Sequence, residues 1–473
     1  MRLQNILNMA RNYLEIGVIL AVVMVLFIVI GYVIIYKKIY KGQKRIDLKK
    51  AFWWFVLVFY LFVVISVTLF SRNRVWNNGQ VISFFYSYKE AWITASETAW
   101  RNIILNILMF VPLGVWLPLG KKRFCSFWKT TLVGCLLSVG IEIFQLLLSL
   151  GLFEVADVFN NTLGTMIGYG FYKIVEIFIQ LFKKEKTQLS RVGACQIPLI
   201  LTICIFTGIF VAYENQELGN LSIECISPNA EDTFEIVSDE EYSSAQGKAM
   251  VYKTNTLTLE ETEAFASAFF ENLGTTLDET RNDAYEESVL YWAENSYSIS
   301  IDYKGGSYNF TDFDTSYPDE GEEQPKPVTD ATEEEIRDAL AVYGIELPTE
   351  AVFMNNTDGV YLFTVERVEI DGNIYDGKLL CEYYDNGKFA SIRNSIKKFD
   401  EYKEFDICSE QEAYEQILSG EFVGAINAGT KINLEQVSIE YMLDTKGYYQ
   451  PIYNFTVDGM EEEQSIQIPA IRK

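Results

Sequence analysis

The sequence predicts a polytopic α-helical membrane domain of six transmembrane helices, followed by an extracytoplasmic α+β region of two lobes. Long apolar runs are confined to residues 1–213. The charge changes sign at the same place: residues 1–213 hold 22 Lys and Arg against 9 Asp and Glu, and residues 214–473 hold 17 against 55. Beyond residue 213, amphipathic helical patterns and alternating strand patterns replace the apolar runs.

Six segments are predicted to cross the membrane, because each is close to the ~20 residues that a helix needs to span a bilayer core. They are residues 16–36, 51–70, 102–120, 130–150, 158–182 and 192–213. The fourth contains Glu142, the fifth contains Lys173 and Glu176, and the other four carry no charge. We expect Lys173 and Glu176 to form an i, i+3 ion pair rather than a functional site.

Loop charges predict the orientation of these spans. Six spans place the basic segments 37–50, 121–129 and 183–191 on one side of the membrane, and the positive-inside rule makes that side cytoplasmic. The N-terminus, the loops 71–101 and 151–157, and everything after residue 213 are then outside. The sequence therefore predicts a multi-pass protein of the cell membrane with an exposed C-terminal region.

Composition excludes several kinds of site. The chain has no histidine, which rules out Ser-His-Asp and Cys-His catalytic sites and His-ligated metal sites. We expect no metal and no cofactor. Cys225, Cys381 and Cys408 are the cysteines of the acidic region, and an odd number of thiols does not indicate a disulfide framework. The formal charge of −38 after residue 213 repels nucleic acid, so no nucleic-acid partner is expected.

Polar residues from three predicted spans converge in the outer half of the membrane. A helix rises ~1.5 Å per residue, which puts Glu142 ~12 Å and Asn106 ~7 Å from the outer surface. Asp157 lies where the fifth span begins. An ionisable residue at this depth costs ~2.5–3.5 kcal/mol on insertion scales, so each is a functional candidate by default.

Spacing supports one shared site. Glu142 and Gln145 lie on one face of the fourth span, and Asp157 and Asn161 lie on one stripe of the fifth. We interpret these residues as a ligand pocket open to the outside, with Arg101 at its mouth opposite Glu142 and Asp157. The alternative is that Glu142 and Gln145 only join helices through hydrogen bonds, with Glu142 protonated.

Small residues and proline predict how the helices pack. Gly164 and Gly168 form a G-x-x-x-G pattern that allows a neighbouring helix to approach closely. Pro112, two residues before Gly114, should bend the third span and free a backbone carbonyl below the polar residues.

The segment 81–100, VISFFYSYKEAWITASETAW, is dense in aromatic residues. It is expected to rest on the outer leaflet as an interfacial belt. A lid over the pocket is the alternative.

Three motifs occur in order within residues 50–182. Arg101 and Asn106 precede FVPLG at 110–114, IEIFQ follows at 141–145, and ADVFNNTLGTMIGY at 156–169. This order resembles the VanZ-like membrane protein family. The resemblance implies a protein of the Gram-positive cell envelope associated with resistance to glycopeptide antibiotics, notably teicoplanin, and no reaction is established for the family as a whole.

The acidic region is predicted to form two α+β lobes, residues 214–314 and 331–473, joined by an acidic, proline-containing linker at 315–330. Amphipathic helices are expected at residues 259–273, 331–343 and 409–419. The end of the chain, from about residue 409, resembles YycI-like, PepSY-related extracytoplasmic regulatory domains. That resemblance implies an extracytoplasmic protein partner for residues 214–473.

Three functional hypotheses follow. The first is a protein that binds a membrane lipid, a lipid-linked cell-wall precursor or a lipoglycopeptide in the outer-leaflet pocket. The second is a membrane-embedded enzyme acting on a lipid-linked substrate, with Glu142 as general acid or base and Arg101 holding an anionic head group. The third is an envelope sensor that works through the acidic lobes.

Overall fold

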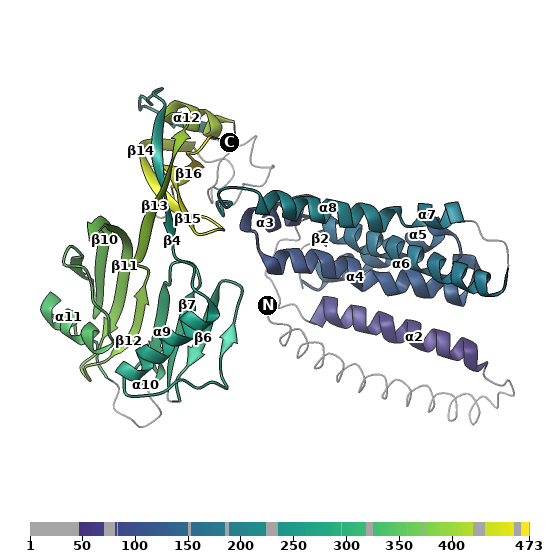
Figure 1. Cartoon of the computed structure of the whole chain (residues 1–473), viewed down its shortest axis with the longest axis horizontal. Coiled ribbons are helices and arrows are strands. Elements are labelled where there is room, and N and C mark those ends of the chain that lie inside the picture. Colours follow the sequence, from purple (N-terminus) through teal and green to yellow (C-terminus); the bar gives the residue numbers. More distant parts are fainter. Residues whose placement is uncertain are drawn as a thin grey trace. The chain divides into compact units, whose positions relative to one another are not determined.

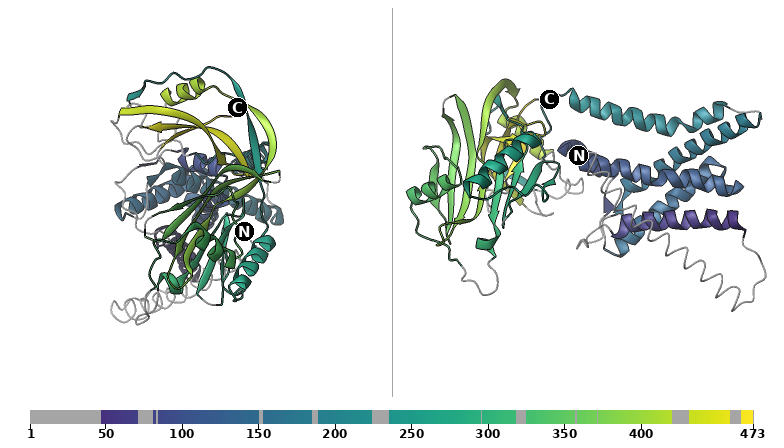
Figure 2. Two further views of the ribbon diagram at one scale, coloured as in Figure 1. Left: turned by 90° about the vertical axis from the view of Figure 1, so that its left-hand side faces the viewer. Right: turned by 60° about the horizontal axis from the view of Figure 1, so that its bottom comes forward.

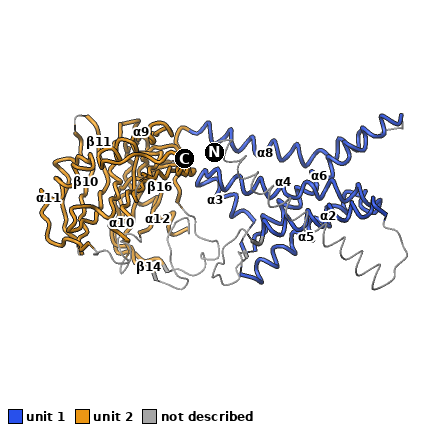
Figure 3. The backbone as a smooth tube through the Cα atoms, turned by 90° about the horizontal axis from the view of Figure 1, so that it is seen from below, with its two compact units in different colours: residues 1–216 blue, residues 217–473 orange. Residues whose placement is uncertain are grey.

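The computed structural model describes residues 47–70, 81–82, 84–149, 153–184, 189–223, 235–294, 296–317, 325–356, 358–370, 372–419, 431–457 and 465–472 (Figure 1). The predicted span 16–36 and Cys225 lie outside these residues. The chain divides into two compact units, Met1–Gln216 and Glu217–Lys473 (Figure 3).

The described part of unit 1 is almost entirely helical. Its helices are α2 (Leu48–Ile65), continued by the π-helical turn η2 (Ser66–Phe70), α3 (Tyr86–Thr94), α4 (Glu97–Gly120), η3 (Lys122–Phe124), α5 (Phe127–Leu147), α6 (Val155–Phe182), α7 (Leu189–Cys195) and α8 (Ile197–Glu214). Two short strands, β1 (Val81–Ile82) and β2 (Phe153–Glu154), pair in parallel. Figure 1 shows α2, α4, α5, α6 and α8 running along the length of the unit.

Four helices among the described residues are long and apolar enough to cross a membrane. They are Leu48–Thr68, Glu97–Gly120, Phe127–Leu147 and Ile197–Glu214. The predicted fifth span is helical as α6, but it is not among these four, since Asn160, Asn161 and Lys173 make it less apolar. The structure confirms several helices apolar enough to span a membrane, and the number six remains a prediction.

The predicted span 192–213 is not one continuous helix. α7 ends at Cys195 and α8 begins at Ile197, with Pro198 in its first turn. Proline favours the first turn of a helix because it lacks the N–H that continues a preceding one. At the junction, Gln196 Nε2 donates to the Gly170 carbonyl at 2.9 Å, which ties the break to α6.

α2 and α4 are joined by side chains that bond backbone carbonyls. The Trp53 indole donates to the Trp116 carbonyl, and the Trp116 indole donates to the Trp53 carbonyl, both at 3.2 Å. The Tyr60 hydroxyl donates to the Met109 carbonyl at 2.8 Å, one turn before Pro112. An indole or phenol buried among apolar residues needs such an acceptor, so these bonds determine where α2 lies against α4.

α4 and α6 approach so closely that backbone meets backbone. A Cβ added to Gly114 would lie 2.1 Å from the Thr165 carbonyl oxygen. One added to Gly164 would lie 1.9 Å from the Ile107 carbonyl oxygen, and one added to Gly168 would lie 2.1 Å from another α4 carbonyl. Only glycine fits at these three positions. This contact brings the polar residues of the two helices together.

The described part of unit 2 is a mixed sheet with helices. Its strands are β3 (Glu235–Ser238), β4 (Gly247–Thr254), β5 (Asp283–Ala284), β6 (Ser288–Trp292), β7 (Tyr297–Asp302), β8 (Tyr308–Asp312), β9 (Val352–Asn355), β10 (Val360–Ile370), β11 (Asn373–Tyr383), β12 (Phe389–Asn394), β13 (Lys397–Ile407), β14 (Lys431–Leu443), β15 (Tyr448–Val457) and β16 (Ile466–Pro469). Its helices are α9 (Leu259–Asn272), α10 (Phe313–Ser316), α11 (Glu333–Val342) and α12 (Glu410–Leu418). The predicted helices at 259–273, 331–343 and 409–419 are confirmed.

These strands form one hydrogen-bonded sheet in the order β3-β14-β15-β4-β13-β11-β12-β8-β7-β6-β5. β10 and β9 branch from β11, and β16 pairs with β15. β14 and β3 are parallel, and the other pairs are antiparallel. The long strands twist strongly, as the left view of Figure 2 shows.

Two hydrophobic cores lie along this sheet. The larger contains Phe270 and Ile336, so residues from both sides of segment 315–330 share it. The smaller contains Ile417 and Phe455, on α12 and β15. The predicted division at 315–330 therefore does not separate two cores, because strands β8 and β12 pair across it.

The start of unit 2 is attached to the turn between β14 and β15. The buried carboxylate of Asp444 accepts hydrogen bonds from the backbone N–H groups of Gly219 at 2.6 Å, Lys446 at 2.8 Å and Tyr448 at 2.8 Å. Gln450 Nε2 donates to the same carboxylate at 2.5 Å and to the Gly219 carbonyl at 3.0 Å. These bonds hold the first residues of unit 2 against the β14–β15 turn of the same unit.

Cys381 and Cys408 are buried free thiols. Burial raises the pKa of the Cys381 thiol to about 12, so this thiol stays protonated and unreactive at neutral pH.

Three helices of unit 2 begin with the same capping box. In α9, α11 and α12 the N-cap hydroxyl accepts from the N3 backbone N–H, and the N3 glutamate accepts from the N-cap backbone N–H. The N-cap and N3 residues are Thr258 and Glu261, Thr332 and Glu335, and Ser409 and Glu412.

Enlarging the contact glycines should destabilise unit 1. We expect Gly164→Leu to lower the free energy of unfolding of unit 1 by ~1–3 kcal/mol or more, the usual cost of overpacking. The new side chain meets backbone that cannot move aside. Thermal unfolding in detergent measures this. Gly140→Leu and Gly208→Leu are matched controls, since a Cβ at either position meets nothing within 4 Å. Equal destabilisation by a control would contradict the packing argument.

Acid should loosen the capped helices of unit 2. Hydrogen bonds from the N-cap residues lower the pKa of Glu261 and Glu335, and the Arg472 guanidinium and Ser409 lower that of Glu412. A lowered pKa contributes stability above the ordinary value of 4.5, which is lost as pH falls through the folded value. As the pH falls below 4.5, we expect α9, α11 and α12 to exchange amide hydrogens faster, after correction for intrinsic rates. Glu261→Gln should flatten this dependence for α9 alone.

Candidate functional site

A cluster of buried polar side chains lies where α4, α5 and α6 meet. Glu142 is 2% exposed, Gln145 1%, Asp157 8% and Asn161 3%. Asn106 is half-buried beside them. We call these five residues the polar cluster. They come from three successive long helices, α4, α5 and α6.

α4 and α6 contribute a hydrogen bond between side chains to the polar cluster. Asn106 Nδ2 donates to Asp157 Oδ1 at 2.6 Å. The bond spans the interface that the contact glycines make narrow, and Asp157 lies in the first turn of α6, where the helix dipole stabilises a carboxylate. The sequence interpretation named both residues but did not pair them.

α5 contributes two further bonds. Glu142 Oε2 accepts the backbone N–H of Glu154 at 3.1 Å, which holds the start of α6 against α5. Gln145 Nε2 donates to the Thr68 carbonyl at 3.0 Å, in the π-helical turn that follows α2. Thr68 lies in the last turn of this helical segment, where carbonyls lack intrahelical partners, so the amide supplies a donor.

The polar cluster and the adjacent Asn160 contain amide atoms that the described residues leave unsatisfied. Asn161 Nδ2 donates to Ser138 Oγ at 2.8 Å, but Asn161 Oδ1 has no partner there. The same holds for Gln145 Oε1 and for Nδ2 of the fully buried Asn160. Each buried unsatisfied group costs ~1–3 kcal/mol, so their concentration in one place calls for a polar ligand or water.

The aromatic segment 81–100 covers the start of α6. The Tyr88 hydroxyl donates to Asn160 Oδ1, and Ser87 Oγ donates to Glu154 Oε2 at 2.9 Å. The Phe84 ring packs edge-on against Phe159, with ring centroids 5.1 Å apart. Among the described residues the segment therefore covers the first turns of α6, and the interfacial belt and the lid both stay predictions.

Sequence reasoning missed Tyr88, Ser87 and Ser138. The aromatic density of the segment was visible, but which hydroxyl reaches Asn160 depends on α3 folding back over α6. Ser138 lies on the same face of α5 as Glu142 and Gln145, at i−4 and i−7, so helical spacing could have identified it.

Arg101 lines a different face of α4. It belongs to a cavity of about 500 Å³ whose described lining comes from α3, α4 and α8. Asn106 is bonded to α6 instead. The sequence predicted one pocket with Arg101 at its mouth. The contacts differ from this prediction, because residues 101 and 106 are about 140° apart around α4 and contact different neighbouring helices.

Lys173 and Glu176 form the ion pair expected from their spacing, with Nζ and Oε2 2.6 Å apart. Tyr172 adds a hydrogen bond to Glu176 Oε1 at 2.9 Å. This pair is confirmed as a structural feature of α6.

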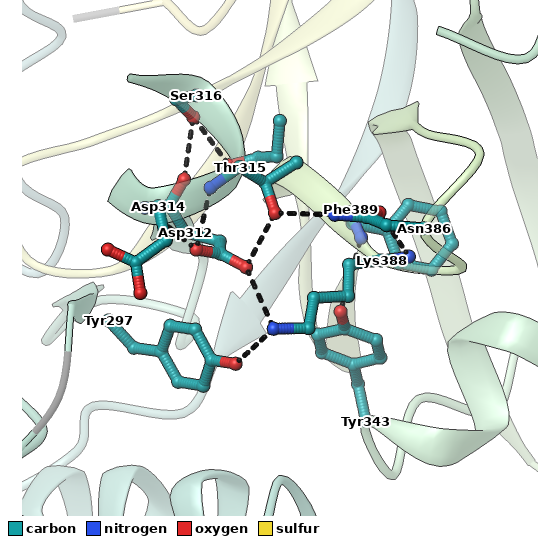
Figure 4. Close-up of polar contacts among 10 residues, drawn as sticks. Tyr297, Asp312, Asp314, Thr315, Ser316, Tyr343, Asn386, Lys388 and Phe389 are labelled. Carbon is teal, nitrogen blue, oxygen red and sulfur yellow. Dashed lines mark hydrogen bonds and ion pairs between the residues drawn. The ribbon is translucent and has the colours of Figure 1, made fainter. Parts of the chain in front are cut away.

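Unit 2 holds a separate group of polar contacts around the buried Asp312 (Figure 4). Asp312 Oδ1 accepts the backbone N–H groups of Asp314 at 3.0 Å and Thr315 at 3.1 Å, and Oδ2 accepts Thr315 Oγ1 at 2.9 Å. Lys388 Nζ donates to the Tyr297 hydroxyl at 3.2 Å and lies 3.9 Å from Asp312 Oδ2. Both carboxylate oxygens are engaged by the N-terminus of α10, so this cluster connects β8, α10 and β12.

Comparisons with known proteins bear on residues 55–176. This segment matches the family model described as VanZ/LLP1 and is a VanZ-like domain. Protein VanZ of Enterococcus faecium is 28% identical over 120 residues, which cover 25% of this chain and 71% of that protein. A crystal structure of an uncharacterized protein from Eubacterium rectale aligns at 12% identity and a TM-score of 0.26, over 50% of this chain and 87% of that one.

Removal of the Tyr88 hydroxyl should loosen the cover. Tyr88→Phe leaves Asn160 Oδ1 without its donor, at a cost of ~1–3 kcal/mol. We expect faster hydrogen exchange in α3, with little change in α2. Tyr60→Phe is the matched control, since its hydroxyl bonds the Met109 carbonyl, and it should affect α2 instead. The cover would be independent of Tyr88 if α3 exchanged at the same rate in both variants.

Proposed function

We propose that the VanZ-like domain of residues 55–176 binds a lipid-linked envelope component or a lipoglycopeptide, and that it contributes to resistance to teicoplanin-type glycopeptides. The protein is then a multi-pass protein of the Gram-positive cell membrane. Its polar cluster lies in the outer leaflet, with the N-terminus and unit 2 outside the cell. The family match and the similarity to Protein VanZ support this setting.

The observation that carries the binding proposal is the set of unsatisfied amides. Gln145 Oε1, Asn160 Nδ2 and Asn161 Oδ1 are two acceptors and one donor, buried in helices apolar enough to span a membrane or in their immediate neighbour α6. A ligand with hydroxyl and amide groups would satisfy them. Membrane lipid tails would not, since they have no polar atoms.

Binding is favoured over catalysis at this site. Glu142 is almost fully buried, and one of its oxygens accepts the Glu154 N–H, a role that an amide oxygen can also fill. A general acid must give up a proton and a general base must take one up, whereas Glu142→Gln keeps the hydrogen-bond acceptor and removes both abilities. The two mechanisms therefore differ in their response to this one change.

Antibiotic susceptibility of a Gram-positive host tests the proposal. We expect the wild-type chain to raise the inhibitory concentration of teicoplanin by several fold. Asn161→Ala and Gln145→Ala should remove most of this protection, because each deletes an amide that would bind the ligand. Glu142→Gln should retain it. Membrane levels of each variant are measured in parallel.

Glu176→Gln is the matched control, since Glu176 is a polar residue of the same helix bundle outside the polar cluster. Its protection should equal that of wild type. Absence of protection by the wild-type chain would reject the resistance role. Loss of protection in Glu142→Gln at normal membrane levels would favour the enzyme instead.

A further inference from the structure

The cavity lined by Arg101 opens on the face of α4 that turns away from the polar cluster. Its volume is about 500 Å³. It lies between the first turns of α4, the end of α3 and the last turns of α8, so it is at one end of the spanning helices. Its described lining consists of Trp92, Ala95, Glu97, Trp100, Arg101, Ile104, Leu105, Ile209, Phe210, Tyr213 and Glu214.

Aromatic rings form much of the wall. Trp92 and Tyr213 pack edge to face with centroids 6.1 Å apart, and Trp100 and Phe210 do so at 5.5 Å. Each pair joins α8 to α3 or α4, so the rings are held in place by the helix packing. The faces of tryptophan and tyrosine carry negative electrostatic potential and attract ammonium groups.

The charged lining residues are Glu97, Glu214 and Arg101, a formal charge of −1. The two carboxylates add to the attraction that the rings exert on a cation. Arg101 offers a planar guanidinium, the group best suited to a phosphate or carboxylate. A head group with an ammonium and an anion a few bonds apart matches both signs.

The cavity also has an apolar side. Ile104, Leu105 and Ile209 line it, and Leu105 is 50% exposed on the surface of a helix apolar enough to span a membrane. An acyl chain leaving the cavity along this face would stay among apolar side chains and membrane lipid.

We propose that this cavity binds a membrane lipid with a zwitterionic head group. The ammonium lies against the Trp92, Trp100 and Glu214 side of the cavity, the phosphate lies at Arg101, and an acyl chain follows Leu105. The site is separate from the polar cluster and does not depend on the proposed function.

Native mass spectrometry of the full-length protein, exchanged from detergent into mixed lipid, tests this site. The probes are phosphatidylethanolamine and phosphatidylglycerol with identical acyl chains, which differ in the ammonium. We expect the wild type to retain phosphatidylethanolamine in roughly fivefold preference, in line with a cation–π contribution of about 1 kcal/mol. Glu214→Gln should reduce this preference, and Arg101→Gln should reduce retention of both lipids.

Both variants change charge and leave the packed aromatic rings of the cavity wall in place. Glu176→Gln lies in α6, outside the described lining of the cavity, and should behave as wild type. Equal retention of the two lipids by the wild type would overturn the proposal. An unchanged preference in Glu214→Gln would do the same, and preferential retention of phosphatidylglycerol would assign the cavity to an anionic lipid. The readout involves no antibiotic, so failure here leaves the teicoplanin test unaffected.

Discussion

The backbones of α4 and α6 touch where Gly114 meets Thr165 and where Gly164 meets Ile107. Side chains would normally keep two helices 8–10 Å apart. Here the glycines remove that spacing, and the short side chains of Asn106 and Asp157 can then bond directly across the interface. Glu142 of α5 bonds the start of α6, and Asn161 of α6 bonds Ser138 of α5. These two bonds extend the same arrangement to α5, which packs against α6.

The polar cluster has two consequences for the domain. Its satisfied bonds hold α5, α6 and the turn after α2 in one register, which a purely apolar interface specifies less sharply. Its unsatisfied amides cost free energy, since they leave buried polar atoms whose partners the described helices do not supply. Segment 81–100 is tied to the start of α6 by the hydrogen bond from Tyr88 to Asn160.

Unit 2 follows a different logic. Among its described acidic residues only Asp312 and Asp444 are buried, while two apolar cores lie along one continuous sheet. Three of its glutamates have a structural role, since they complete the capping boxes that begin α9, α11 and α12. The attachment of Gly219 to Asp444 places a bonded segment only a few residues after the end of α8.

The sequence by itself determined the apolar helices, the change of character near residue 213, the glycine contact pattern and the membership of Asn106, Glu142, Gln145, Asp157 and Asn161 in one region. Each follows from local composition or helical period, which do not depend on the rest of the chain. Tertiary structure decided that Asn106 pairs with Asp157, that Tyr88 reaches Asn160, and that Arg101 faces α8. It also joined residues on both sides of segment 315–330 into one core. These outcomes depend on how helices rotate against each other and which strands pair, and such long-range contacts leave no periodic signal in the sequence.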